Sequence, residues 1–152
     1  FPYTTLFRSA SQHSLAFQVA GGVNVVEGVG VMKGGGMSNV SLEKVIQWNP
    51  EYIISWDFET RGGAERQIRN SDDWSSIRAV KEGKVYAMPN IPFAFCDRPP
   101  GVNRFMGIQW LANLFYPDYY DVDMVEATRE FYHRCYWRDI TEDQAKHILN
   151  LA

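Results

Sequence analysis

Two segments of the chain carry side chains that could do chemistry together. The segment DFETRGG holds Asp57, Glu59 and Arg61, and the segment NIPFAFCDRPP holds Asp97 and Arg98. Carboxylates from the two segments could act as a general acid and a general base if they lay close together. Arginine guanidinium groups instead bind carboxylates and oxyanions through paired donors. The residue types therefore fit either an acid–base site or a site that binds an anion.

Aromatic side chains accompany these charges in both segments. Trp56 and Phe58 lie in or beside the first segment, and Phe93 and Phe95 lie in the second. Aromatic rings offer flat apolar contact to a chelate or a macrocycle. Phe93 and Phe95 share the same parity along the chain, so one can contact a ligand while the other packs against the helix that follows. Trp56, at the end of a predicted strand, fits a core position equally well.

The sequence does not contain the known catalytic or metal-binding motifs that would indicate an enzyme. The glycine-rich segment 28–39 has Lys33 where a dinucleotide-binding loop requires glycine, and it lacks the Gly-Lys-Ser/Thr of a phosphate loop. It is interpreted as a flexible connection. No Gly-x-Ser-x-Gly nucleophile motif is present, and the three histidines lie in separate segments. Cys96 and Cys135 fit no zinc spacing, and we expect two buried thiols rather than a disulfide.

Composition narrows the class of protein further. With 152 residues and 17.5 kDa the chain has the size of one domain. Its net charge of −3 argues against general nucleic-acid binding, which needs an excess of Lys and Arg. No run of 18 apolar residues is present to span a membrane. Because Phe1 is not an initiator methionine, we expect a fragment or a processed product.

Predicted strands and helices alternate along the chain. EYIISW (51–56) and GKVYAMP (83–89) are predicted strands, and VNVVEG (23–28) is a short strand candidate. Helices are predicted at 10–22, 41–49, 101–116, 123–137 and 141–151, and one or two short helices are predicted within 61–80. This alternation predicts an α/β three-layer domain with a mostly parallel sheet and helices on both faces. Ligands of such sheets meet the loops that follow the strands, where both aromatic segments lie.

Four segments, in order, resemble one known family. They are VSLEKVIQWNPEYIISW, then W…IRAVKEGKVYAMP, then PFAFCDRPPGVNRFMGIQWLANLFYPDYY, then EFYHRCYWRDITEDQAKHIL. They resemble the solute-binding proteins of ABC importers for ferric siderophores, haem, cobalamin and some oxyanions. The resemblance implies one lobe of a two-lobed extracytoplasmic protein, either periplasmic or a cell-surface lipoprotein. It also implies no catalysis, no resident metal and no cofactor besides the transported ligand.

The resemblance divides the chain into two parts. Residues 10–152 correspond to the carboxyl-terminal lobe, whereas the amino-terminal lobe and the connecting helix are absent. Residues 1–9 (FPYTTLFRS) are interpreted as a strand or as a non-native leader, and they stand where the first strand of this lobe belongs. A missing strand exposes a sheet edge, so we expect self-association unless residues 3–7 fill the gap.

The resemblance also assigns roles to residues. Glu43 matches the acid with which such lobes dock on arginines of a membrane permease. An acid in the first turn of a helix also interacts favourably with the helix dipole, and both roles are compatible. The ligand-binding residues implied are Trp56, Phe58, Arg61, Phe93, Phe95 and Arg98.

Two other functions stay open at this point. One is a small α/β enzyme that uses Asp57, Glu59 or Asp97 as acid or base. The other is an interaction domain in which Glu43 and its neighbours dock a partner without a small ligand. The arginines favour an anionic ligand such as a carboxylate siderophore, haem propionates or a molybdate-like oxyanion. The aromatic residues favour a flat organic ligand, and an iron complex is the leading expectation.

Overall fold

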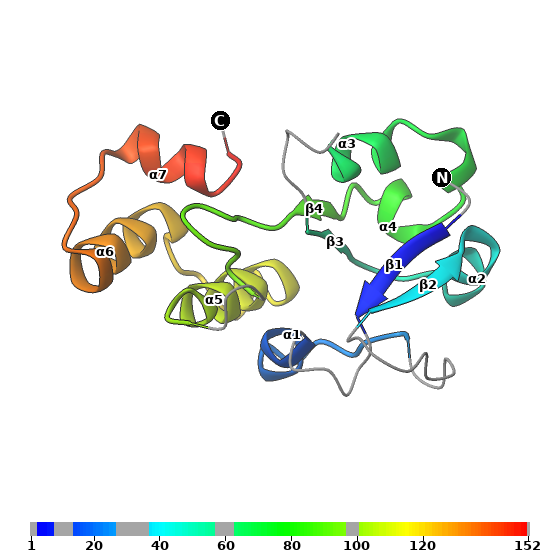
Figure 1. The fold of residues 1–152 in the computed structure, drawn as a ribbon, viewed down its shortest axis with the longest axis horizontal. Coiled ribbons are helices and arrows are strands. Elements are labelled where there is room, and N and C mark those ends of the chain that lie inside the picture. The colour runs from blue at the N-terminus through cyan, green and yellow to red at the C-terminus, as the bar shows by residue number, and fades with distance from the viewer. Residues whose placement is uncertain (1–2, 8–13, 27–36, 57–62, 97–100, 152) are drawn as a thin grey trace. The chain divides into compact units, whose positions relative to one another are not determined.

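The computed structural model describes residues 3–7, 14–26, 37–56, 63–96 and 101–151 (Figure 1). The chain divides into two compact units. The first comprises Phe1–Ser14 with Asn24–Met88, and the second comprises Leu15–Val23 with Pro89–Ala152.

Four strands form two small sheets in the first unit. Strand β3 (Ile53–Ser55) pairs in parallel with β4 (Val85–Ala87), with Ile53 opposite Val85. Both strands were predicted, and their parallel pairing confirms the predicted α/β class. Strand β1 (Tyr3–Phe7) pairs antiparallel with β2 (Met37–Ser41). A strand was one of two interpretations of the segment that contains β1, but β2 and its pairing with β1 were not predicted.

Strand β2 corrects the prediction that all of segment 28–39 is a loop. Its residues Met37–Ser41 are paired along their whole length with β1. Val40, near the end of β2, is buried in the core of the first unit. Burying this β-branched side chain stabilises a strand where glycine content alone predicted none. The predicted loop residues 28–36 lie outside the described residues.

The helices of the first unit are short and surround one core. They are α2 (Leu42–Trp48), α3 (Ala64–Arg69), the 3-10 helix η3 (Asp72–Trp74) and α4 (Arg78–Lys81). Helix α2 ends at Asn49, which has a left-handed conformation before Pro50, as predicted. The buried core consists of Val40, Val45, Trp74, Ile77, Ala79 and Val85.

The second unit is helical in its described part. It contains α1 (Leu15–Val19), α5 (Asn103–Phe115), α6 (Met124–Tyr136) and α7 (Glu142–Ile148). Helix α7 begins with the predicted capping box, in which Thr141 and Gln144 bind each other's backbone N–H groups. Helix α6 begins at Asp123, whose carboxylate accepts hydrogen bonds from two backbone N–H groups of the first turn.

The strand candidate at 23–28 is wrong over its described residues. Within residues 14–26 no strand follows α1, and the chain instead turns at Gly21, which has φ +82°. The Val26 N–H donates to Asn24 Oδ1 at 3.0 Å, which is a local bond that competes with strand pairing. Glycine and asparagine therefore override the β-branched valines of this segment.

Candidate ligand-binding site

The predicted ligand residues are described only in part. Trp56 lies directly after β3 in the first unit and is half-buried. Phe93 and Phe95 lie in the second unit. The other predicted residues lie outside the described residues: Phe58, Arg61 and Arg98, and the acids Asp57, Glu59 and Asp97.

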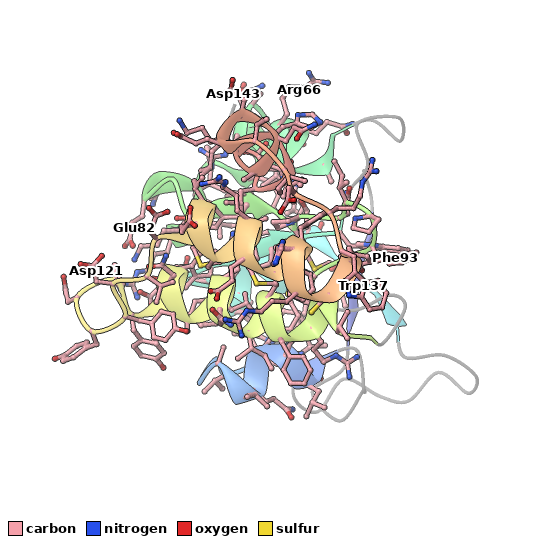
Figure 2. All side chains as sticks on the ribbon, turned by 90° about the vertical axis from the view of Figure 1, so that its left-hand side faces the viewer. Arg66, Glu82, Phe93, Asp121, Trp137 and Asp143 are labelled. Carbon is pink, nitrogen blue, oxygen red and sulfur yellow. The ribbon has the colours of Figure 1, made fainter. Side chains whose placement is uncertain are left out.

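Phe93 and Phe95 differ sharply in exposure. The side chain of Phe93 is 46% exposed, whereas that of Phe95 is fully buried. The segment 91–96 is a series of bends rather than an extended strand, so equal parity does not place the two rings on one side. Phe95 was predicted as a ligand contact, and its burial corrects this prediction because no surface of the ring is accessible. Phe93 projects outward and stays a candidate (Figure 2).

Helix α5 packs directly against the backbone of this segment. A Cβ atom added at Gly107 would lie 2.4 Å from the Phe95 carbonyl oxygen and 3.0 Å from Cys96 Sγ. Only glycine allows the helix and the segment to approach this closely. The Arg104 Nε–H, one turn earlier, donates to the Cys96 carbonyl oxygen at 3.4 Å. Phe95 is thus held in place by its own backbone as well as by its buried ring.

Asn103 fixes the backbone beneath Phe93. Its side chain is 2% exposed, and its Nδ2 donates to the Phe93 carbonyl oxygen at 3.0 Å. Its Oδ1 accepts a hydrogen bond from the Tyr136 hydroxyl of α6. One buried amide therefore joins α5, α6 and the segment that carries Phe93. Sequence analysis missed Asn103, although its spacing to Met106, Gly107 and Trp110 marks one buried helix face.

Two tyrosines of α6 hold the same segment from another side. The Tyr132 hydroxyl donates to the Ile91 carbonyl oxygen at 2.5 Å. Burial raises the pKa of Tyr132 and, to a smaller extent, that of Tyr136, so both phenols stay neutral donors at physiological pH. The exposed side chain of Phe93 is therefore displayed on an anchored backbone.

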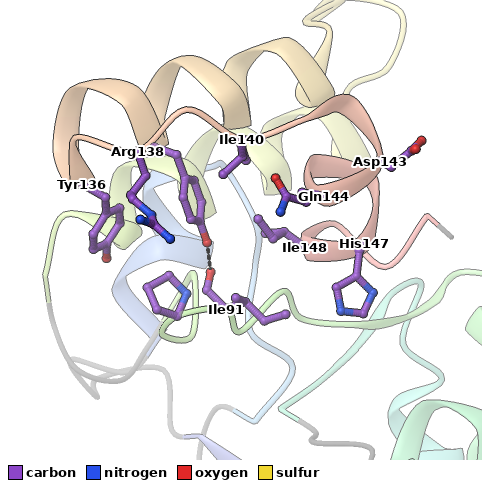
Figure 3. A pocket seen from close by; sticks show the side chains of 10 residues that line it. Ile91, Tyr136, Arg138, Ile140, Asp143, Gln144, His147 and Ile148 are labelled. Atoms are coloured by element: carbon purple, nitrogen blue, oxygen red, sulfur yellow. Dashed lines mark hydrogen bonds between the residues drawn. The ribbon is translucent and has the colours of Figure 1, made fainter.

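A pocket of about 620 Å³ lies beside these tyrosines in the second unit (Figure 3). Sequence analysis did not predict it. The signal for it was the run Tyr136-Trp137-Arg138, where aromatic and basic residues end an amphipathic helix. The lining residues are Ile91, Pro92, Tyr132, Tyr136, Arg138, Ile140, Asp143, Gln144, His147 and Ile148.

Glu43 lies exposed in the first turn of α2. Ser41 occupies the predicted N-cap position, but within the described segment 37–56 its hydroxyl does not cap the helix. It binds the Glu43 carboxylate instead, and this hydrogen bond, followed by one from the Glu43 backbone, lowers the pKa of Glu43 from its usual value. Glu43 is therefore a carboxylate at neutral pH, available to a cation on a partner.

The two thiols have different environments. Cys96 is buried, as predicted, but Cys135 is exposed, which corrects the second half of that prediction. The buried face of α6 runs through Met124, Thr128, Phe131 and Tyr132 and does not include Cys135. In the described part of the chain, these two thiols form no disulfide.

Residues 3–7, 14–26, 37–56, 63–96 and 101–151 contain no group of three or more His, Cys, Asp or Glu placed to hold a metal ion. In the same ranges, no helix has the length and apolar character needed to cross a membrane.

Comparison with known proteins decides the family. The family model described as periplasmic binding protein matches residues 4–92. The chain belongs to the periplasmic binding protein family. The resemblance seen in the four segments is thereby confirmed, and the α/β fold agrees with that of solved family members.

Individual members of the periplasmic binding protein family are similar over part or most of this chain. The molybdate-binding protein MolA of Haemophilus influenzae is 31% identical over 140 residues, covering 91% of this chain and 38% of that protein. An ABC transporter solute-binding protein of Sulfurospirillum deleyianum superposes with a TM-score of 0.85 at 28% identity, covering 97% of this chain and 44% of that one. The iron(3+)-hydroxamate-binding protein FhuD of Bacillus subtilis is 35% identical over 65 residues, covering 43% of this chain and 20% of that protein. The chain thus spans less than half the length of these relatives.

Proposed function

We propose that this chain is the carboxyl-terminal lobe of the substrate-binding component of an ABC importer. In this proposal the whole protein is extracytoplasmic, binds its ligand between two lobes, works with a membrane permease and is not an enzyme. The observation that supports the proposal most directly is the exposure of the Phe93 ring, whose backbone is anchored by a hydrogen bond from Asn103. Family membership supports the same function.

The proposed ligand presents oxygen acceptors to the predicted arginine residues and flat or apolar surface to the predicted aromatic residues. Arg61 and Arg98 supply paired donors to its oxygens, and Trp56, Phe58 and Phe93 supply flat apolar contact. A molybdate-like oxyanion is the first candidate, because the similarity to molybdate-binding MolA extends over 91% of the chain. A ferric hydroxamate is the second, because part of the chain is similar to FhuD and Phe93 offers an exposed ring.

Titration with both ligands tests the proposal and separates the candidates. We expect Arg98→Gln to weaken binding of either ligand by about ten-fold, since a charged hydrogen-bond donor is lost. Phe93→Ala should weaken only the ferric hydroxamate, because molybdate has no apolar surface for the ring to cover. Amide NMR spectra detect the weak binding expected of a single lobe, and Arg134→Gln, on a paired surface arginine, is the matched control. The proposal fails if no molybdate, ferric hydroxamate or haem causes saturable shifts.

Docking on the permease is tested at Glu43. We expect Glu43→Gln to weaken binding to the importer's permease in lipid nanodiscs by about ten-fold, because an exposed carboxylate that faces arginine is neutralised. Glu126→Gln removes another exposed first-turn acid, on α6, and should leave docking unchanged. Equal binding of the Glu43→Gln variant and the parent would show that Glu43 serves only its own helix.

A further inference from the structure

We propose that the pocket beside the end of α6 binds a small organic anion with a flat, apolar body, held by Arg138. The pocket lies within the second unit and measures about 620 Å³. This volume falls in the range of about 300–1,000 Å³ that is usual for small-molecule sites. None of the six residues predicted to bind the transported ligand lines it, so the inference does not rest on the proposed function.

The interior of the pocket is mainly apolar. Ile148 and the rings of Tyr132 and Tyr136 form part of its wall, together with Ile91, Pro92 and Ile140. The two phenol hydroxyls are already engaged, by the Ile91 carbonyl and by Asn103 respectively. The tyrosines therefore offer ring surface to a ligand and contribute no negative charge. An aromatic or alkyl body gains from leaving water for this surface.

The charge of the pocket comes from Arg138. In Figure 3 its side chain points into the pocket, whereas the Asp143 carboxylate points away. Two other arginines of the same region are paired: Arg129 Nη1 lies 2.7 Å from a Glu126 carboxylate oxygen, and Arg134 Nη2 lies 2.6 Å from one of Glu130. Among the residues that the structure describes, Arg138 has no carboxylate within ion-pair distance. A ligand carboxylate is the partner that its guanidinium fits best.

Further polar side chains line the same pocket. The side chains of Gln144 and His147 come from α7 and line the pocket with Arg138. Both residues are exposed. The Gln144 oxygen already accepts from the Thr141 N–H, so its amide NH₂ group is the part that remains for a ligand. The anionic group of a ligand would thus meet the Arg138 guanidinium in a pocket that two polar side chains of α7 also line, while its apolar body lies on the tyrosine rings.

Naphthoate is a suitable probe, because it joins a flat apolar body to one carboxylate. We expect saturable shifts in amide NMR spectra of the full chain, centred on Ile91, Arg138 and α7. Arg138→Gln should weaken binding by about ten-fold, since it exchanges a charged donor for a neutral one. Arg134→Gln removes an arginine already paired with Glu130 and should bind the probe like the parent.

An uncharged probe tests the role of the ligand's charge, and a variant that fills the pocket tests where the probe binds. Naphthamide has the same shape without the charge and should bind about ten-fold more weakly than naphthoate. His147→Trp fills the opening from an exposed position on α7, outside the capping box, and should abolish binding while thermal unfolding stays unchanged. The inference is overturned by an absence of saturable shifts, by equal affinity of Arg138→Gln, or by unchanged binding in His147→Trp. Binding of naphthoate without any response to molybdate or ferric hydroxamate would support the pocket and count against the proposed function.

Discussion

Replacing Gly107 with alanine should lower the free energy of unfolding by about 2–3 kcal/mol. The added Cβ would lie 2.4 Å from the carbonyl oxygen of Phe95 and 2.6 Å from its carbonyl carbon. Both distances are far below van der Waals contact, and the obstacle is backbone that cannot rotate away. Helix α5 or the segment 91–96 must therefore move. Urea-induced unfolding of the two proteins measures the difference.

Whether Gly107→Ala lowers or raises the free energy of unfolding distinguishes the effect of packing from the effect of helix propensity. Alanine is about 1 kcal/mol more favourable than glycine in a helix interior. Propensity alone would therefore make Gly107→Ala more stable than the parent. Gln109→Ala changes propensity in the same helix without adding volume beside Phe95, and it should be nearly neutral. A Gly107→Ala variant as stable as the parent would show that α5 does not pack on this backbone.

Asn103→Ala should cost about 3 kcal/mol of stability, because it removes two hydrogen bonds and leaves their buried partners unsatisfied. The Phe93 carbonyl oxygen loses its bond from Nδ2, and the Tyr136 hydroxyl loses its acceptor. The backbone beneath Phe93 is then no longer tied to α5. We therefore expect weaker binding of any ligand that stacks on Phe93, in addition to the loss of stability.

Tyr136→Phe is the matched control for Asn103→Ala. It removes only the hydroxyl and should cost about 1 kcal/mol, the usual net value of one hydrogen bond. In the double variant the two effects should be less than additive, because one bond is shared between the residues. Chemical unfolding measures all four proteins. If Asn103→Ala costs no more than Tyr136→Phe, the bond to the Phe93 carbonyl contributes nothing.

Local patterns predicted many element boundaries correctly. The Thr141/Gln144 capping box and the end of α2 at Asn49 were both expected from the sequence and are confirmed. These features depend on bonds and clashes between residues four or fewer positions apart, which the sequence displays directly. The two strands β3 and β4 were equally clear, since short β-branched runs between breakers have few alternatives.

Local sequence patterns did not predict contacts between segments that are distant in the sequence. The antiparallel pairing of β2 with β1 joins residues 30 or more positions apart, and the glycines before β2 predicted a loop. The thiol of Cys135 was assigned to the core, yet the buried face of α6 turns away from it. Which face of a helix is buried depends on the elements that pack against it, and those are distant in the chain.

Some features of the candidate site could likewise be predicted from the sequence, whereas others depend on the tertiary structure. Residue types and order were sufficient to recognise the periplasmic binding protein family, to place aromatic and arginine residues in two segments after strands, and to select Glu43 as an exposed acid. They could not distinguish Phe93 from Phe95, because that choice depends on Gly107 and Asn103 of α5. They could not reveal the pocket at Arg138, whose walls come from segments some 50 residues apart. Local geometry follows from neighbouring residues, whereas burial and pocket shape arise when distant segments exclude water together.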